Sequence, residues 1–259
     1  MAQFLPRNVQ AGAGTRVDAG ALDAGLRAHM VRVYNYLAGG IGIAALIAYG
    51  LFSMSVTTDP ALAVATLGSH RLTAFGAAFF TSPLYMVVAF APLVLMIGAM
   101  FFAQRLSVGG TQALYWTLVA LIGASLSAVF MRYRIGSAAQ VFAITSVAFA
   151  SLSLYGYTTK RDLSGFGTFL IMGLIGIILA SLLNIWFQSG ALQFAISVIG
   201  VLVFAGLTAY DTQRIKDEYL MIAGDTVGVA KAAVWGALSL FLDFVNMFQM
   251  LLSLIGNRE

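Results

Sequence analysis

Seven long apolar stretches constrain this chain more than any other feature of its sequence. A bilayer core of about 30 Å needs about 20 apolar residues in a helix, and each stretch meets or approaches that length. They cover residues 34–56, 84–103, 111–131, 137–157, 166–187, 191–211 and 232–255. Strands of an outer-membrane barrel alternate apolar and polar residues, and these stretches do not. The sequence therefore predicts an all-α integral membrane protein, a bundle of seven transmembrane helices.

Composition excludes two other classes of protein. Sixty per cent of the residues are hydrophobic and 9% are charged, against about 45–50% and about 25% in soluble domains. These values exclude an ordinary soluble enzyme, and we do not expect catalysis. High hydrophobicity with low charge also excludes a disordered chain. The chain has no cysteine, which removes disulfides, thiolate metal sites and Cys nucleophiles, and we expect no cofactor.

Short connections predict a single compact bundle over residues 34–259. The links at 104–110, 132–136, 158–165 and 188–190 are too short for anything but neighbouring antiparallel spans. Residues 1–33 read as a loose N-terminal cytoplasmic segment, which can become an interfacial helix from about Leu22. The longest link, 57–83, has an apolar middle at 61–67 that can lie along the membrane interface.

Basic residues set the expected orientation, because loops rich in Lys and Arg stay in the cytoplasm. With the N-terminus inside, ten basic residues face the cytoplasm: Arg7, Arg16, Arg27, Arg32, Arg105, Lys160, Arg161, Arg214, Lys216 and Lys231. Four face outward: Arg71, Arg132, Arg134 and Arg258. We therefore expect a cytoplasmic N-terminus and an external C-terminus. In a membrane protein the net charge of +4 is a topology signal, and we expect no nucleic-acid partner.

Asp243 is the most informative residue, because it lies close to the middle of the last span. A carboxylate at that depth costs a few kcal/mol on insertion scales, and such residues usually mark an ion or proton path. The alternative is a purely structural role, in which Asp243 is a neutral acid that hydrogen-bonds between helices. Asn246 shares the face of Asp243 and Gln249 continues it, so this polar stripe should face the bundle interior or water.

Asp211, at the end of the sixth span, is a second candidate with a stronger structural alternative. Arg214 follows at i+3 and can form an interfacial ion pair with Asp211. Arg105, at the end of the second span, taken alone reads as an anchor whose charge reaches the interface.

Two stretches around these aspartates resemble the signature sequences of the Bax inhibitor-1 (TMBIM) family, in its bacterial branch. They are Ala209–Lys216, AYDTQRIK, and Phe241–Phe248, FLDFVNMF. The opening of the first span, His29–Leu37, is also similar to that branch. The resemblance implies a seven-helix fold with the last helix central, in the bacterial inner membrane. It also implies a pH-sensitive calcium leak.

The resemblance further implies roles for individual residues. By motif, Asp211 and Asp243 correspond to two aspartates that hydrogen-bond to each other as a pH sensor. By position alone, Arg105 corresponds to an arginine that latches the first of them. The second span contains no acidic residue, so a calcium ion would have only Asp211 and Asp243 as carboxylate ligands here.

Elementary electrostatics explains how such a pair of aspartates would respond to pH. Two neighbouring carboxylates do not both ionise cheaply, so they share a proton and titrate together. Raising the pH removes that proton and makes two anions repel, which biases a two-state element. Ca²⁺ prefers about six to eight oxygens, so two carboxylates bind it weakly, as a conduction path requires. Asp211 reaches the depth of Asp243 if the sixth helix continues toward Lys216, if the seventh is shifted, or through a water-filled cavity.

Other functions stay open. The resemblance also allows a non-transporting regulator that binds another membrane protein, such as a membrane protease. An intramembrane aspartyl protease also uses two aspartates, and Tyr210-Asp211 fits one of its motifs. However, no glycine stands in the three residues before Asp243. A retinal protein needs a lysine inside the last span, and Lys231 lies only at its edge.

Overall fold

The computed structural model describes residues 19–259. In this part of the chain, seven helices are long and apolar enough to cross a membrane. They are α1 (Ala19–Ser55), α3 (Pro83–Phe102), α4 (Val108–Leu126), α5 (Ile135–Thr158), α6 (Ser164–Phe187), α7 (Gly190–Ile222) and α8 (Thr226–Ile255). The predicted fold class and span count are confirmed.

The first helix begins earlier than the sequence suggested. We expected a loose segment that could become an interfacial helix from about Leu22, whereas α1 runs without a break from Ala19 into the first span. Leu26, Met30, Val33 and Leu37 are all buried, and they recur at the spacing of one helix face. That apolar stripe extends the helix beyond its membrane-spanning part. The rest of the predicted N-terminal segment, 1–18, lies outside the described residues.

The longest link folds into a small unit of its own. After the 3-10 turn Pro60–Leu62 come β1 (Ala65–Leu67), β2 (His70–Leu72) and the short helix α2 (Ala74–Phe80). The strands pair antiparallel, and Gly68 makes the turn with φ +59°, a conformation that glycine adopts without strain. The apolar residues 61–67 predicted only an interfacial stretch here, and the hairpin was not predicted.

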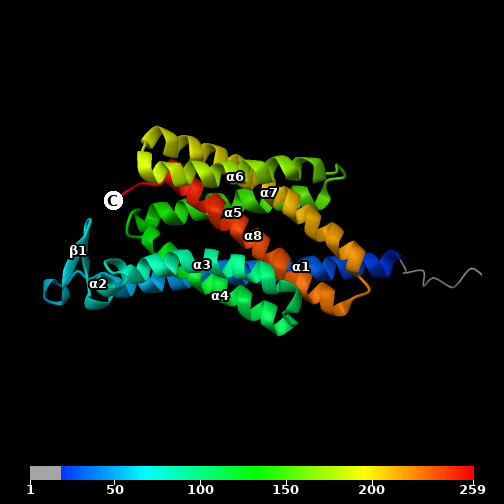
Figure 1. The fold of residues 1–259 in the computed structure, drawn as a ribbon, viewed down its shortest axis with the longest axis horizontal. Coiled ribbons are helices and arrows are strands. Elements are labelled where there is room, and N and C mark those ends of the chain that lie inside the picture. The colour runs from blue at the N-terminus through cyan, green and yellow to red at the C-terminus, as the bar shows by residue number, and fades with distance from the viewer. Residues whose placement is uncertain (1–18) are drawn as a thin grey trace, which may run out of the picture.

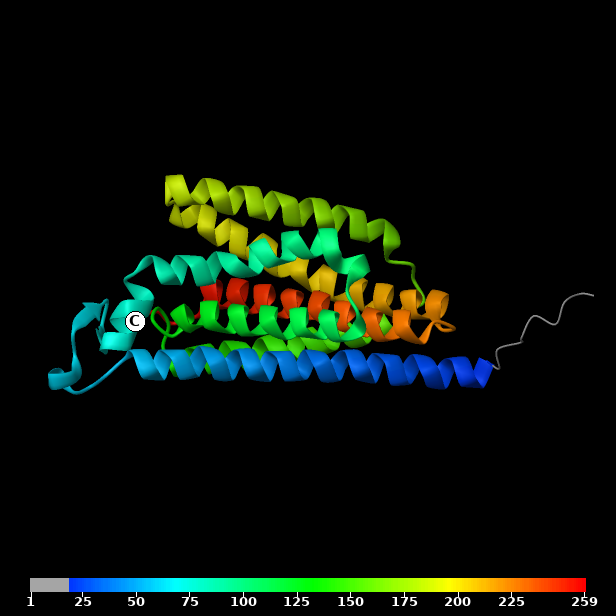
Figure 2. The same cartoon turned by 60° about the horizontal axis from the view of Figure 1, so that its bottom comes forward.

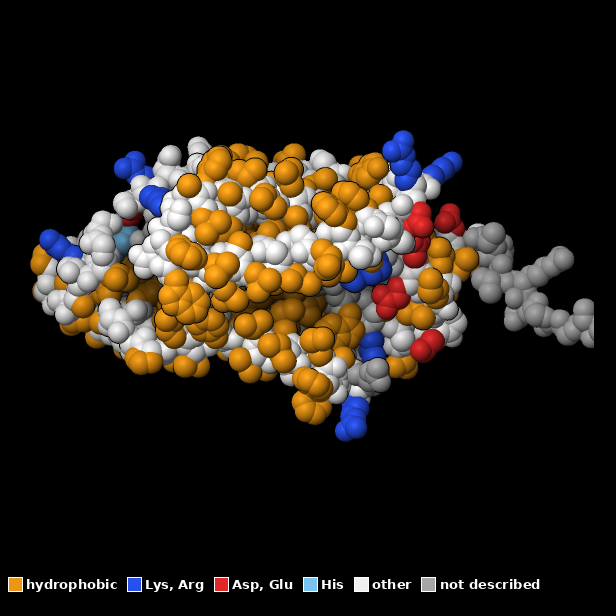
Figure 3. All heavy atoms as spheres, turned by 45° about the horizontal axis from the view of Figure 1, so that its top comes forward, with side chains coloured by type: hydrophobic (Ala, Val, Ile, Leu, Met, Phe, Trp, Pro, Cys, Tyr) orange, Lys and Arg blue, Asp and Glu red, His pale blue; other side chains and the backbone are white. Residues whose placement is uncertain are grey.

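Successive helices alternate in direction, so each end of the bundle collects particular loops (Figures 1 and 2). The β1–β2 hairpin, α2 and the last residues of the chain lie at one end, called the hairpin end below. The start of α1 and the α7–α8 connection lie at the other, called the N-terminal end. Figure 3 shows hydrophobic side chains between the two ends and charged ones gathered at them, as expected for a band of surface in lipid.

The last helix is the centre of the bundle, as the resemblance implied. Helix α8 packs against α1, α4, α5 and α7, most extensively against α7, and lies among the other helices in Figure 2. Helices α3 and α6 pack mainly on α4 and α7 and form an outer layer. In the most apolar stretch of α8, 44% of the residues are buried inside the bundle, against 11% in the corresponding stretch of α3. Helix α3 is therefore the least enclosed of the spanning helices.

Close helix packing depends on small residues at defined points. A Cβ atom at Gly156 of α5 would overlap the carbonyl oxygen of Ala209 on α7. A Cβ atom at Gly123 of α4 would lie 2.8 Å from the Cα atom of Ala44 on α1. Contacts between small residues are a main source of helix association in lipid. The first of these contacts brings α5 against α7 close to Asp211.

Candidate functional site: an aspartate pair and a neighbouring cavity

Asp211 is buried on α7 and is ion-paired within its own helix. Its side chain is 11% exposed, and its Oδ1 atom lies 3.3 Å from an Nη2 atom of Arg214. The same Arg214 nitrogen donates a hydrogen bond to Ser239 Oγ on α8 at 3.0 Å. Arg214 therefore joins the aspartate of α7 to the neighbouring helix, and the ion pair suggested by the i+3 spacing is present.

Asp243 lies on α8, one helical turn beyond Ser239, and is 5% exposed. Its Oδ2 atom is buried without a hydrogen-bond partner. The charges of Asp211 and Arg214 both act on this carboxyl group. The two aspartates are therefore electrostatic neighbours across the α7–α8 contact, with one arginine beside them.

The length of α7 explains how residues from different predicted depths meet. Our sequence-based span ended at residue 211, whereas α7 continues to Ile222, about three further turns. Asp211 is thus inside the helix and not at its end. The first of the three possibilities, a sixth spanning helix that runs past Lys216, is the one observed.

Arg105 lies apart from this pair in the described arrangement. It ends a short 3-10 turn, Ala103–Arg105, that follows α3, and its side chain is exposed. The cation that pairs with Asp211 here is Arg214. The assignment of Arg105 as a latch therefore remains a prediction, which would require α3 to move toward α7.

A chain of hydroxyl groups ties three helices together beside Asp211. The Tyr34 hydroxyl on α1 and Ser153 Oγ on α5 are 2.7 Å apart, and Ser153 Oγ and Thr212 Oγ1 are 2.9 Å apart. Thr212 Oγ1 donates to the carbonyl oxygen of Thr208, so Ser153 donates to Thr212 and Tyr34 donates to Ser153. The chain fixes the helical segment that carries Asp211.

Three further hydrogen bonds anchor the same part of α7 to the end of α5 and to the α5–α6 connection. Gln213 accepts a hydrogen bond from the Leu163 N–H at 2.8 Å and donates one to the Arg161 carbonyl oxygen at 2.8 Å. Lys216 Nζ donates to the Tyr157 carbonyl oxygen at 3.2 Å. The residues that follow Asp211 on α7 are thus held by fixed neighbours.

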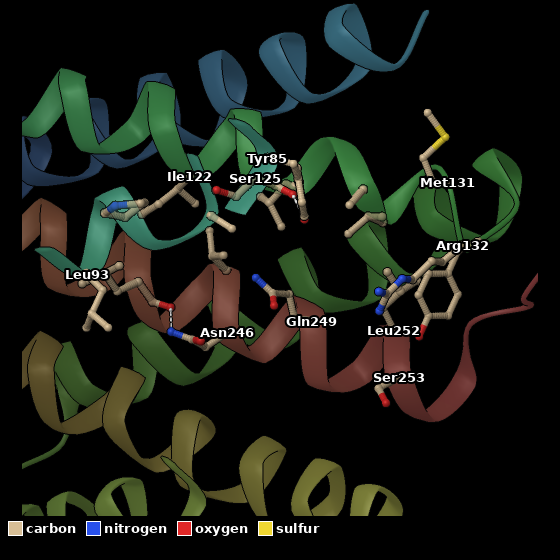
Figure 4. Close-up of a pocket in the computed structure, with 18 of the residues that line it drawn as sticks. Tyr85, Leu93, Ile122, Ser125, Met131, Arg132, Asn246, Gln249, Leu252 and Ser253 are labelled. Carbon is tan, nitrogen blue, oxygen red and sulfur yellow. Dashed lines mark hydrogen bonds between the residues drawn. The ribbon is translucent and has the colours of Figure 1, made fainter. Parts of the chain in front are cut away.

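The polar stripe on α8 divides between two environments. Asn246 and Gln249, one and two turns beyond Asp243, line a cavity of about 940 Å³, as Figure 4 shows. Asn246 Nδ2 also donates to the Leu242 carbonyl oxygen at 2.8 Å. Asp243 does not line the cavity. Asp243 is thus enclosed by helices, whereas Asn246 and Gln249 border the cavity.

This cavity separates α3 from α8 over the half of the bundle near the hairpin end. Helix α3 contributes a mainly apolar wall that includes Ala89, Pro92 and Leu93. Gln193 of α7 and Ser125 of α4 add polar atoms. At the mouth are Arg132, Tyr133, Arg258 and Glu259. It will be called the α3–α8 cavity.

The structure offers no ready metal centre in the part of the chain it describes. Between residues 19 and 259, no group of three or more His, Cys, Asp or Glu side chains gathers where a metal ion could bind. A weak Ca²⁺ site at Asp211 and Asp243 remains a prediction that rests on two carboxylates alone.

Sequence reasoning missed Tyr34, Ser153, Thr212 and Ser239, and it gave Arg214 only a supporting role. Hydroxyl residues are common in membrane helices because they can bond to their own backbone, as Ser151 does with Val147. Ser153 therefore looked no different from Ser151. The available signals were the family-like stretches His29–Leu37 and Ala209–Lys216, which contain Tyr34 and Thr212.

Comparison with known proteins identifies a family and relatives that include membrane proteins. The model of the family described as "Inhibitor of apoptosis-promoting Bax1" matches residues 26–259. An uncharacterized protein of Caulobacter vibrioides is 50% identical over 240 residues, 92% of each chain. Inner membrane protein YbhL of Escherichia coli K12 is 42% identical over 237 residues, 91% of this chain and 94% of the relative. An uncharacterized membrane protein of Streptococcus pyogenes is 31% identical over 237 residues, 92% and 96% of the two chains.

Proposed function

The chain belongs to the Bax inhibitor-1 family of membrane proteins, and from this starting point we propose that it is a pH-sensitive leak channel for cations, with Ca²⁺ as the main ion. The observation that carries the proposal is the buried juxtaposition of Asp211 and Asp243 beside Arg214. Acidic side chains inside a membrane protein cost free energy, and they usually mark a path for ions or protons. A transport role, in preference to catalysis, is part of the proposal.

The pair acts as the pH-dependent element. At low pH the two carboxyl groups share a proton, because two buried anions so close together are unfavourable. Raising the pH removes that proton, and the two anions then repel each other across the α7–α8 contact. Arg214 opposes this repulsion, since it pairs with Asp211 and also bonds to Ser239 on α8. The leak is therefore closed in acid and opens as the pair loses its proton.

The route for the ion combines the pair with the α3–α8 cavity. The cavity reaches Asn246 from the hairpin end, and Asp243 follows one turn deeper on the same helix. Separation of α7 from α8 would join the cavity to the N-terminal end. Two carboxylates and a few amide oxygens hold Ca²⁺ weakly, and weak binding lets a conducted ion leave.

Arg105 has a role in this proposal as a second cation for Asp211. Helix α3 is the least enclosed spanning helix, so movement of α3 against α4 breaks few contacts with the core. Such a movement would bring Arg105 closer to Asp211, where it would add to Arg214 in holding the closed state.

Orientation and location complete the proposal. The ten-to-four distribution of basic residues favours a cytoplasmic N-terminal end, and the related YbhL is named an inner membrane protein. We therefore assign the hairpin end to the outer face of a bacterial inner membrane. Protease access to a tag before residue 1 from the outer face of intact cells would contradict this orientation.

The test is Ca²⁺ entry into liposomes that contain the purified protein, at acidic and at mildly alkaline pH. Wild type should conduct more at alkaline pH, whereas Asp211→Asn and Asp243→Asn should lose that dependence. Asp217→Asn, an exposed residue of the same helix, is the matched control and should behave as wild type. No flux above empty liposomes at either pH would refute the leak and favour the regulator that binds a membrane protease or another membrane protein.

A further inference from the structure

The mouth of the α3–α8 cavity carries two arginines and one glutamate, Glu259, an excess of basic side chains that is unusual beside a cation path. Arg132 and Arg258 both line it. Cation channels generally have acidic rings at their entrances, and basic side chains belong to sites for anions. The cavity therefore needs an explanation that the leak alone does not provide.

The backbone brings these two arginines together. Residues 132–134 and 257–259 form a short antiparallel contact, in which Tyr133 pairs with Arg258. The Arg134 N–H donates to the Asn257 carbonyl oxygen at 3.1 Å, and the Glu259 N–H donates to the Arg132 carbonyl oxygen at 3.0 Å. The contact joins the α4–α5 connection to the end of the chain, so the arginines occupy fixed positions at one mouth.

Carboxylates near this mouth do not neutralise the arginines. Glu259 Oε2 lies 2.8 Å from Nε2 of His70 on the β1–β2 hairpin, and Ser69 also donates to Glu259 at 3.4 Å. Among residues 19–259, no ion pair with a carboxylate includes Arg132 or Arg258. The guanidinium of Arg258 instead lies over the ring of Tyr133, 5.9 Å from its centroid. Two guanidinium groups are thus free to bind a ligand.

The deeper wall of the cavity has the opposite character. On α3 it consists of Ala89, Pro92, Leu93 and Met96, and Leu93 is 55% exposed. Figure 3 shows the surface hollowed between α3 below and the α6–α7 pair above, on a face covered by hydrophobic side chains. Figure 4 shows Arg132 at one end of the cavity and Leu93 at the other. The cavity is therefore cationic at its mouth, and its α3 wall is apolar, opposite the amide side chains of Asn246 and Gln249 on α8.

From this polarity we propose that the α3–α8 cavity binds one anionic phospholipid from the leaflet at the hairpin end. Arg132 and Arg258 bind its phosphate through charge-assisted hydrogen bonds, which are stronger than neutral ones. One acyl chain lies along the α3 wall, near Ala89 and Leu93. A volume of about 940 Å³ accommodates a headgroup and part of one chain. The bound lipid covers Asn246 and Gln249 from the outer face, so it occupies the outer part of the proposed ion route while the leak is closed.

Lipid binding is measured by native mass spectrometry of the full-length protein, released from nanodiscs that contain phosphatidylglycerol or only phosphatidylcholine. Wild type should retain one phosphatidylglycerol and no phosphatidylcholine. Arg132→Gln/Arg258→Gln should bind phosphatidylglycerol at least about tenfold more weakly, since hydrogen bonds to charged groups contribute about 1.5–3 kcal/mol. Arg134→Gln is the matched control, because Arg134 is exposed at the same level but does not line the cavity, and it should bind like wild type.

The acyl-chain part of the proposal has its own variants. Ala89→Phe narrows the apolar end without changing charge and should also weaken binding at least about tenfold, since the chain loses buried apolar area. Val87→Phe, two residues away on an exposed position outside the cavity, should have no effect. Both variants must elute as wild type in size-exclusion chromatography, which separates lost binding from misfolding.

Three results would overturn the assignment. One is equal retention of phosphatidylcholine and phosphatidylglycerol, and another is the same loss in Arg134→Gln as in the double variant. The third is binding of inorganic phosphate at the arginines together with unchanged lipid binding in Ala89→Phe, which would indicate a site for a free anion. None of these measurements depends on ion flux, so the lipid site can fail while the leak stands, and the reverse.

Discussion

The aspartate pair and the α3–α8 cavity share one helix but have opposite chemistry. Asp243 is enclosed where α1, α4, α5 and α7 surround α8. One turn farther on, Asn246 borders an open space because α3 packs on α4 and stays away from α8. The acids are therefore buried near the centre, whereas the arginines stand at the mouth. The position of α3 therefore decides which part of the polar stripe on α8 is desolvated.

This difference predicts different sensitivities to pH and to salt. A buried pair is screened little by ions in solution, and an exposed arginine rim is screened strongly. Substitutions at the pair should change how flux depends on pH. Substitutions at the rim should change how flux depends on ionic strength.

The largest effect is expected from Asp243→Asn. The amide cannot ionise, so the repulsion that opens α7 against α8 disappears, and the ratio of alkaline to acid Ca²⁺ flux should fall to about one. Flux into liposomes over a series of pH values measures this ratio. Retention of the wild-type pH profile would remove Asp243 from the sensor.

Arg214→Gln should have the next largest effect and tests which cation holds the pair. Without Arg214 the closed contact loses its ion pair with Asp211 and its hydrogen bond to Ser239, so the onset of flux should move to lower pH by about one unit, a modest value because Arg214 is half exposed. Arg105→Ala should act in the same direction and raise the leak in acid, if α3 brings Arg105 to Asp211. An acid leak as low as in wild type would exclude Arg105 from the mechanism.

Neutralising the rim should alter flux without altering its pH dependence. Arg132→Gln/Arg258→Gln removes two charges that repel cations at the mouth, so Ca²⁺ flux at alkaline pH should rise about two- to fivefold at low salt. The increase should disappear at high salt. A shift of the pH profile in this variant would mean that the rim and the pair are not independent.

The smallest effect concerns stability near the pair. Ser153→Ala interrupts the chain from Tyr34 to Thr212 and should lower the free energy of unfolding by about 1 kcal/mol. Ser151→Ala removes only a bond to its own helix at Val147 and should change little. Denaturant unfolding in detergent compares the two, and equal losses would show that the chain adds nothing specific.

Sequence alone predicted much of this molecule because lipid imposes a simple length rule. All seven spans were found, and Asp243 was recognised by its depth. The start of α1 and the end of α7 were not predicted. Around Leu26 and Ile215 the hydropathy falls, but one face of each helix stays buried, so the helix continues beyond the apolar span. The hairpin was missed because its strands have three residues each, too few to produce a pattern.

The site could be predicted only in part, for a physical reason. Asp211 and Asp243 carry charges that are out of place in lipid, so each is visible in the sequence. Arg214, Ser239 and Ser153 act through contacts between helices, and such contacts depend on rotation about the helix axis. The α3–α8 cavity likewise follows from where α3 packs, which no local pattern contains.

The central claim is that Asp211 and Asp243 share a proton in the closed state and lose it on opening. Infrared difference spectroscopy of the reconstituted protein, in the band of protonated carboxyl groups, observes that proton during a change from acid to alkaline pH. The account predicts a protonated-carboxyl signal in acid that disappears over the pH range in which Ca²⁺ flux rises. The signal should be altered by Asp211→Asn and by Asp243→Asn, and unchanged by Asp217→Asn. A signal that persists unaltered in both of the first two variants would contradict the account.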